Sequence, residues 1–169
     1  MFKIPNTKNG FTLIELLVVI GIIGLLATII TINVQSARQK ARCGKRRADI
    51  VSVQAPLEVY YDANKAYPNT GGAWWGISAS YGSRDVTGSN GWVPNLAPTY
   101  IRRLPSDPAD DNGNRSYLYR SDGSNYKVLS HYSHTDGCTL GDSKDTLYDP
   151  ARTVTAWMVC SGEPACSSW

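Results

Sequence analysis

An almost unbroken run of apolar residues, from Phe11 to Ile32, follows a short polar segment over residues 1–10. About 20 helical residues at about 1.5 Å each span the roughly 30 Å hydrocarbon core of a bilayer. The run therefore predicts a helix that can cross a membrane, and Glu15 is its only charged residue. A charge within such a segment costs about 2.5–3.5 kcal/mol on insertion scales, so Glu15 needs a reason to be there.

The helical pattern continues beyond the apolar run, over residues 33–63. Pro56 is expected to kink this helix or to remove one of its hydrogen bonds, and Pro68 with the Gly71–Gly72 pair marks its end. Small residues recur at steps of three and four, which places them in one stripe along the helix. The stripe suits close packing, either on the domain's own sheet or on neighbouring helices. It consists of Ala37, Ala41, Gly44, Ala48, Val51 and Ala55.

The last third of the chain, residues 114–169, has the composition of a small sheet. Ser116–Arg120 and Tyr126–Ser130 are rich in Tyr, Leu and Val and flank an Asp-Gly turn, which predicts a hairpin. Thr153–Cys160 is predicted as a third strand. The fold class is therefore α+β: a long N-terminal helix whose second half packs on a small antiparallel sheet.

Residues 64–113 are predicted to form a long loop region with a short helical turn. Trp74, Trp75, Tyr81 and Trp92 lie in this region. They could form a carbohydrate-binding cluster, but such aromatic residues more often cap a small core or pack between subunits. We favour the packing interpretation.

The junction at Gly10 carries a family resemblance. The sequence G-F-T-L-I-E-L-L, which begins at Gly10, resembles the start of type IV pilins and of the pseudopilins of type II secretion. The stretch Y-I-R-R-L-P-S-D-P over residues 100–108 also resembles both groups. The resemblance implies the pilin fold, with a leader over residues 1–10, a transmembrane and filament-core helix over 11–32, its amphipathic continuation, and a globular head over 64–169.

The same resemblance implies roles for three residues. A prepilin peptidase of the inner membrane would cut after Gly10 and methylate Phe11. Glu15 resembles the assembly glutamate of the family, whose partner is the N-terminal amine of a neighbouring subunit's Phe11. This pairing is physically reasonable because a carboxylate that is costly alone in low dielectric is tolerated with a cation beside it. One departure is Ile32, where many pilins carry a proline; Gly21 and Gly24 would be the weak points of this helix.

The resemblance implies a structural subunit that polymerises into an extracellular type IV pilus through its hydrophobic helix. The partners would be other copies of the chain, the prepilin peptidase, a membrane assembly platform and, before assembly, membrane lipids. The aromatic-rich loop and the C-terminal cysteines favour a pilin. The alternatives are a pseudopilin of a type II secretion or competence system and, from another class, a membrane-tethered binding domain. No catalytic or specific nucleic-acid-binding motif stands out, so we do not expect an enzyme.

The net charge of +3 is concentrated just after the apolar run. Counting Lys and Arg alone would place the C-terminal domain in the cytoplasm, whereas the resemblance implies a single-pass protein of the inner membrane with its head outside the cytoplasm. We follow the resemblance, because long domains can translocate regardless of charge. The charges would contact lipid headgroups or acidic partner subunits. This basic belt consists of Arg38, Lys40, Arg42, Lys45, Arg46 and Arg47.

The chain has four cysteines, at positions 43, 138, 160 and 166. Three of them in a loop-rich C-terminal region of an exported domain predict one disulfide with one cysteine left over. Cys138–Cys160 is the first choice because it would tie a loop to a strand, and Cys160–Cys166 is the alternative. Cys43 is expected to be an unpaired thiol on the helix surface.

Two groups of carboxylates invite a calcium interpretation, because hard cations take oxygen ligands. The first contains Asp107, Asp110 and Asp111, and major pseudopilins of secretion systems hold calcium in this domain. The spacing is not that of an EF-hand, since the sixth position from Asp110 is Arg115 instead of glycine. Solvated turns explain both groups equally well, so the sequence predicts no cofactor beyond this calcium alternative. The second group is Asp136, Asp142 and Asp145.

Overall fold

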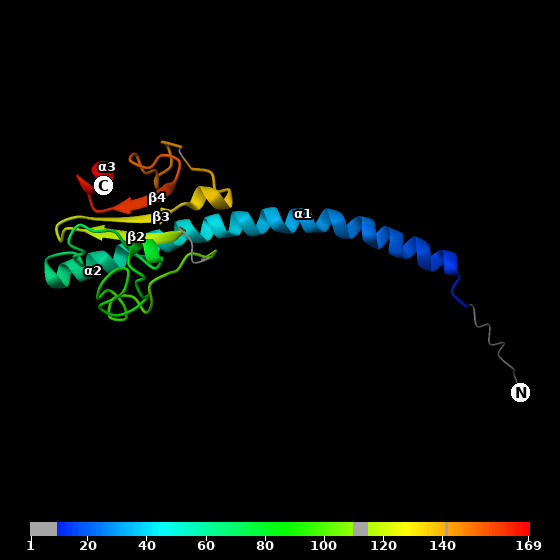
Figure 1. The fold of residues 1–169 in the computed structure, drawn as a ribbon, viewed down its shortest axis with the longest axis horizontal. Helices are drawn as coiled ribbons and strands as arrows, with labels where there is room; N and C mark the ends of the chain where they lie inside the picture. Colours follow the sequence, from blue (N-terminus) through cyan, green and yellow to red (C-terminus); the bar gives the residue numbers. More distant parts are fainter. Residues whose placement is uncertain (1–9, 110–114, 141) are drawn as a thin grey trace, which may run out of the picture. The chain divides into compact units, whose positions relative to one another are not determined.

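The computed structural model describes residues 10–109, 115–140 and 142–169, and the chain divides into two compact units, Met1–Arg38 and Gln39–Trp169. Figure 1 shows the chain as a ribbon. Its elements are α1 (Leu13–Ser52), α2 (Gln54–Asn64), β1 (Trp75–Gly76), the 3-10 helix η1 (Ala79–Tyr81), β2 (Ser116–Ser121), β3 (Tyr126–His131), the 3-10 helix η2 (Ser133–Asp136), β4 (Ala156–Cys160) and α3 (Ala165–Ser168).

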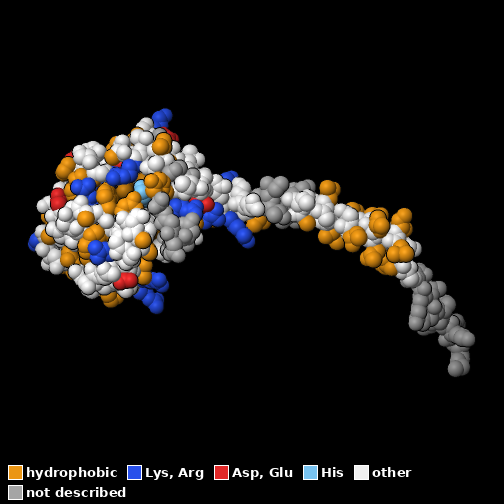
Figure 2. Space-filling model, viewed as in Figure 1, with side chains coloured by type: hydrophobic (Ala, Val, Ile, Leu, Met, Phe, Trp, Pro, Cys, Tyr) orange, Lys and Arg blue, Asp and Glu red, His pale blue; other side chains and the backbone are white. Residues whose placement is uncertain are grey.

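The first unit is the N-terminal part of α1 and the residues before it. The helix runs without interruption through Gly21 and Gly24. Its large apolar side chains are exposed, from Phe11 at 81% to Leu26 at 53%, and Figure 2 shows hydrophobic side chains crowded along this stretch. Among the helices that the structure describes, none is long and apolar enough to cross a membrane.

The helical continuation is broken between α1 and α2, as the sequence predicted from Pro56. The break falls at Val53, which adopts φ −83° and ψ −19°. Pro56 has no N–H to donate to the carbonyl of Ser52, four residues earlier, so the ladder of hydrogen bonds is interrupted there. The chain still turns as a helix, because the Leu57 N–H donates to the Val53 carbonyl at 3.2 Å.

The sheet has four antiparallel strands in the order β1-β2-β3-β4. The predicted hairpin is confirmed: β2 pairs with β3 from Ser116↔His131 to Ser121↔Tyr126. The predicted third strand is present as β4, although it begins later, at Ala156.

Strand β1 was not predicted, because two residues give no alternating pattern. Its close pairing with β2 is favoured by the absence of a side chain at Gly76. A Cβ at this position would lie 2.5 Å from Leu118 Cδ2 and 3.1 Å from the Tyr117 carbonyl oxygen. The glycine therefore lets the loop backbone approach β2 closely enough to pair with it.

The core of the second unit lies between the helices and one face of the sheet (Figure 1). Ile50 of α1 and Leu57 of α2 are fully buried there, which confirms the α+β architecture. The stripe of small residues is exposed on the helix, so it does not pack on the domain's own sheet. The strands contribute alternate residues to this core, namely Tyr117, Tyr119, Tyr126, Val128, Trp157 and Val159.

Candidate functional site

The N-terminal end of α1 is closed by a reciprocal pair of hydrogen bonds between Thr12 and Glu15. The Thr12 N–H donates to Glu15 Oε2 at 2.9 Å, and the Glu15 N–H donates to Thr12 Oγ1 at 3.3 Å. The Thr12 hydroxyl also donates to Glu15 Oε2, at 2.7 Å. This is a capping box, which satisfies two backbone donors that a helix N-terminus otherwise leaves without partners. The spacing T-x-x-E is a recognised sequence signal for this motif, and our sequence analysis missed it.

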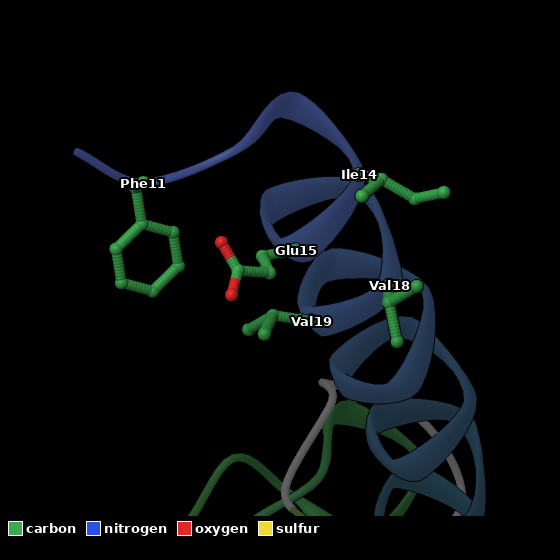
Figure 3. A pocket seen from close by; sticks show the side chains of 5 residues that line it. All are labelled: Phe11, Ile14, Glu15, Val18 and Val19. Carbon is green, nitrogen blue, oxygen red and sulfur yellow. The ribbon is translucent and has the colours of Figure 1, made fainter. Parts of the chain in front are cut away.

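Glu15 lies within an exposed apolar surface. Phe11, Ile14, Val18 and Val19 line a shallow depression with it, and Figure 3 shows its carboxylate between the Phe11 ring and Val19. A surface of this kind can bury its apolar side chains against other helices while it presents one carboxylate.

The peptide bond between Gly10 and Phe11 precedes the helix, and both residues are exposed. An added Cβ on Gly10 would meet no atom within 4 Å, so nothing in the described part of the chain shields this bond. The roles of Gly10, Phe11 and Glu15 in processing and assembly stay predictions.

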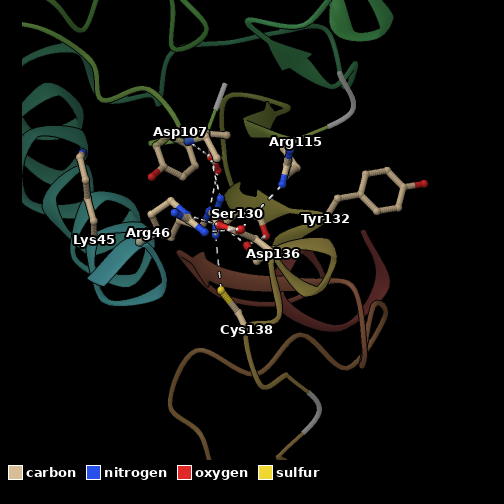
Figure 4. A network of polar contacts seen from close by, with 12 residues as sticks. Lys45, Arg46, Asp107, Arg115, Ser130, Tyr132, Asp136 and Cys138 are labelled. Atoms are coloured by element: carbon tan, nitrogen blue, oxygen red, sulfur yellow. Dashed lines mark hydrogen bonds and ion pairs between the residues drawn. The ribbon is translucent and has the colours of Figure 1, made fainter. Parts of the chain in front are cut away.

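The basic belt on α1 behaves differently from the expectation that it meets lipids or partner subunits. Most of its cations bind carboxylates of the same chain, and Figure 4 shows Arg46 among Asp107, Asp136 and Cys138. Lys45 pairs with Asp49, one helical turn away. The other pairs join α1 to distant loops: Arg42 with Asp136, Arg46 with Asp107 and Asp136, and Arg47 with Asp145.

Arg46 lies at the centre of this arrangement and is fully buried. Its Nε and Nη2 donate to the two carboxylate oxygens of Asp107 at 2.8 and 2.9 Å. Its Nη1 donates to Asp136 Oδ2 at 2.9 Å and lies 3.4 Å from Cys138 Sγ. A buried guanidinium is tolerated only when its donors are paired in this way.

The arginines also set the electrostatics of the carboxylates. Hydrogen bonds from Arg42, followed in weight by those from Arg46, lower the pKa of Asp136 to about 2. The hydrogen bonds from Arg47 lower the pKa of Asp145. Asp136 therefore remains charged well into the acid range.

The predicted disulfide Cys138–Cys160 is wrong, and so is the free thiol predicted at Cys43. Cys43 pairs with Cys138 across 95 residues, and Cys160 pairs with Cys166, which was the alternative. The error arose because the sequence does not show that the loop after η2 returns to α1. Cys43 and Arg46 lie on neighbouring turns of that helix, so one segment carries both the covalent and the ionic contacts.

The calcium candidates do not form a calcium site in the part of the chain that is described. Asp110 and Asp111 lie outside the described residues. Asp107 and Asp136 have both carboxylate oxygens occupied by arginine donors. Asp145 likewise binds Arg47 through both oxygens. In residues 10–109, 115–140 and 142–169, no group of three or more His, Cys, Asp or Glu side chains is placed to hold a metal ion.

The aromatic residues of the loop region do not form a shared binding platform. Trp92 is fully buried and its Nε1 donates to the Pro105 carbonyl at 3.1 Å. The Trp75 ring is covered by the Arg84 guanidinium at 3.6 Å, and Trp74 packs against a small apolar cluster on the other face of the sheet. These contacts confirm the packing interpretation for the tryptophans of this loop region.

Comparison with known proteins agrees with this fold and this N-terminus. The family described as the prokaryotic N-terminal methylation motif matches residues 5–31. The chain is 39% identical to the type II secretion system core protein G of Pectobacterium carotovorum subsp. carotovorum over 101 residues, which are 60% of this chain and 62% of that protein. It is 34% identical to the protein of that name in Vibrio cholerae serotype O1 over 123 residues, 72% of this chain and 76% of the relative.

The protein of the same name in Dickeya chrysanthemi is 29% identical over 157 residues, 92% of this chain and 90% of the relative. The chain thus spans less than two thirds of the Pectobacterium protein and most of the Dickeya protein. No solved structure matches the chain. The methylation motif and the α+β fold define a member of the pilin and pseudopilin superfamily. Within it, the chain belongs to the family of the type II secretion system core protein G.

Proposed function

We propose that the protein is a pseudopilin of a type II secretion system, which polymerises through its N-terminal helix into a filament of identical subunits. The match to core protein G relatives carries this proposal and favours it over our first expectation, a type IV pilus. The type II secretion alternative named from the sequence is therefore the better one.

The first step is processing. The accessible junction at Gly10–Phe11 and the methylation motif that spans it support cleavage there by a prepilin peptidase. Cleavage removes the leader and creates a positive amine at Phe11. Thr12 keeps its own backbone N–H, so the capping box with Glu15 survives the cut.

The second step is assembly from the inner membrane. The large apolar side chains from Phe11 to Leu26 are exposed in the described part of the chain, and burial of apolar surface stabilises by about 25 cal/mol per Å². Lipid covers this surface before assembly, and the helices of other subunits cover it in the filament. Glu15 then adds a charge contact with the Phe11 amine of a neighbour, which fixes the register of packing.

The head lies outside the cytoplasm in this proposal. Two disulfides in one small domain are typical of an oxidising compartment. The internal pairing of the basic belt also weakens the charge argument for the opposite topology, because Arg42, Arg46 and Arg47 are already neutralised by carboxylates of the chain.

Two measurements test the proposal. Mass spectrometry of the mature protein should find an N-methylated Phe11 as the first residue. Deletion of the gene should abolish export of folded proteins into the medium and leave surface pili unchanged, and the wild-type gene should restore export. Loss of surface pili with normal export would show that the chain is a pilin, and a mature N-terminus beyond Ile32 would exclude both functions.

A further inference from the structure

Two contacts hold the second half of α1 to η2 and the loop that follows it. Cys43 on α1 is bonded to Cys138, and Arg46, one turn further along, binds Asp136 just before that cysteine. Arg46 also binds Asp107 from a second loop. We call these residues the Arg46 lock: Cys43, Arg46, Asp107, Asp136 and Cys138.

We propose that the Arg46 lock takes the place of a calcium ion in this head. The domain would then be stabilised by an internal guanidinium and a disulfide, and it would be independent of calcium but sensitive to reduction. The family resemblance implies calcium in this domain, but the carboxylates described above do not fit a calcium site, because their oxygens are bound to arginines. The proposal does not depend on which filament the subunit enters.

The first argument concerns the carboxylate oxygens. Calcium needs six to eight oxygen ligands at about 2.3–2.6 Å. Asp107 Oδ2 accepts from Arg46 Nε, and Oδ1 accepts from Arg46 Nη2 and from the Ala109 N–H. Asp136 Oδ2 accepts from Arg42 and Arg46, and Oδ1 from Arg42. A calcium ion on these oxygens would have to displace two arginines, one of them fully buried.

The second argument concerns charge. Arg46 keeps its positive charge at every pH at which the protein is folded. Its side chain is 0% exposed, and those of Asp107 and Asp136 are 1% and 12% exposed. Loss of the guanidinium would leave a buried Asp107 without a cation, which is among the largest penalties a single substitution produces. The arginine therefore provides a permanent positive charge beside these carboxylates, whereas a metal ion provides one only while it is bound.

The third argument concerns the covalent link. A disulfide restricts the unfolded chain more when it closes a longer loop. Cys43–Cys138 spans 95 residues, whereas Cys160–Cys166 spans 6. The long bridge ends beside Arg46, with Cys138 Sγ at 3.4 Å from Nη1. Opening it would release the loop that carries Asp136, so reduction would loosen the ionic contacts as well.

The experiment is thermal unfolding of the full-length mature protein in detergent, followed by tryptophan fluorescence. The chain is measured with excess calcium, with EDTA, and with dithiothreitol. Dithiothreitol breaks the S–S bond, converts the two sulfurs to thiols and closes to its own cyclic disulfide. We expect the Tm in calcium and EDTA to agree within about 2 °C, and dithiothreitol to lower it by about 10 °C or more.

Matched variants separate the two bridges. The pair Cys43→Ser with Cys138→Ser should lower the Tm about twice as far as the pair Cys160→Ser with Cys166→Ser, because its loop is longer. Calcium should not restore the lost stability. If the variant without Cys43 and Cys138 does not fold, dithiothreitol added to the folded variant without Cys160 and Cys166 opens the long bridge alone and measures its contribution.

A saturable rise in Tm of more than about 5 °C with calcium would overturn the proposal, because binding to the folded state alone stabilises it. A Tm unchanged by reduction of Cys43–Cys138 would overturn it equally. Arg46→Met should lower the Tm in calcium and in EDTA to the same extent, and a rescue by calcium would show that the ion, and not the arginine, holds the carboxylates.

Discussion

The helical residues of the two units differ in where their large apolar side chains lie. In the first, Leu13 and Leu17 are 88% and 66% exposed, whereas in the second Ile50 and Leu57 are fully buried. The only carboxylate near the start of α1 is used locally, in a capping box. The carboxylates around the second half bind arginines from segments far away in the sequence.

This difference separates the contacts that the subunit makes within its own chain from those that need lipid or other subunits. The second unit buries an apolar core and pairs several of its charges within one chain, as an independent folding unit does. In its described residues, the first unit is held together by local contacts, which are the hydrogen bonds of the helix and the Thr12–Glu15 capping box, and its apolar side chains are exposed. An assembling subunit needs both kinds of region.

The largest expected effect on filament assembly comes from Glu15, where the charge can be separated from the cap. Glu15→Ala removes both, whereas Glu15→Gln removes the charge and keeps a side chain that can close a capping box. We expect both variants to be cleaved normally and to lower filament yield by more than about tenfold, a difference of about 1.4 kcal/mol or more. Electron microscopy of sheared filaments beside a blot of the processed pool measures this.

Thr12→Ala is the control for the cap. It removes one side of the capping box, at a cost of about 0.5–2 kcal/mol to the helix, and leaves the carboxylate in place. We expect it to assemble better than either Glu15 variant. If Glu15→Gln assembled normally and Thr12→Ala did not, Glu15 would be a capping residue and not a docking residue.

A pair of leucine truncations sharpens the contrast between the units. Leu57→Ala should lower the free energy of unfolding of the head by about 2–5 kcal/mol, because it leaves a cavity in a packed core. Leu17→Ala should change it by less than about 0.5 kcal/mol, because its side chain is exposed. All five tryptophans lie at or after Trp74, so chemical denaturation followed by tryptophan fluorescence reports on the head alone. Equal losses from the two variants would mean that the units do not fold independently.

The stability of the head should fall in acid because of Asp136. Its pKa is lowered from 3.8 to about 2 in the folded chain, so the unfolded chain takes up the proton first. The stabilisation is present in full above about pH 4 and is lost as the pH falls toward 2. Asp136→Asn should flatten this part of a plot of Tm against pH, and an unchanged slope would show that other carboxylates control the acid transition.

The smallest expected effect belongs to Lys45, an exposed member of the belt. Its pair with Asp49 is one turn apart on the helix surface, and its side chain is 51% exposed. Lys45→Ala should change the free energy of unfolding by less than about 0.5 kcal/mol. Thermal melts at low and high salt would detect a larger role as a salt-dependent loss of Tm.

The sequence by itself determined the features that depend on neighbouring residues. The apolar run, the Gly10–Phe11 junction and Glu15 were all visible as a local pattern, and so were the hairpin around the Asp-Gly turn and the break before Pro56. The T-x-x-E spacing of Thr12 and Glu15 also predicts the capping box. These features follow from helix and strand periodicity and from turn chemistry, which act over a few residues.

Only the tertiary structure decided which distant groups meet. Cys43 forms a disulfide with Cys138 instead of remaining a free thiol, and Arg46 binds Asp107 and Asp136 of the same chain. Gly76 belongs to a fourth strand of the sheet, which no sequence pattern predicted. Contacts across tens of residues depend on how helices, strands and loops pack, and that packing is set by the whole core. The residues next to a cysteine or an arginine do not show whether its partner lies in the same chain or outside it. The partners of Cys43 and Arg46 therefore became known only from the folded structure.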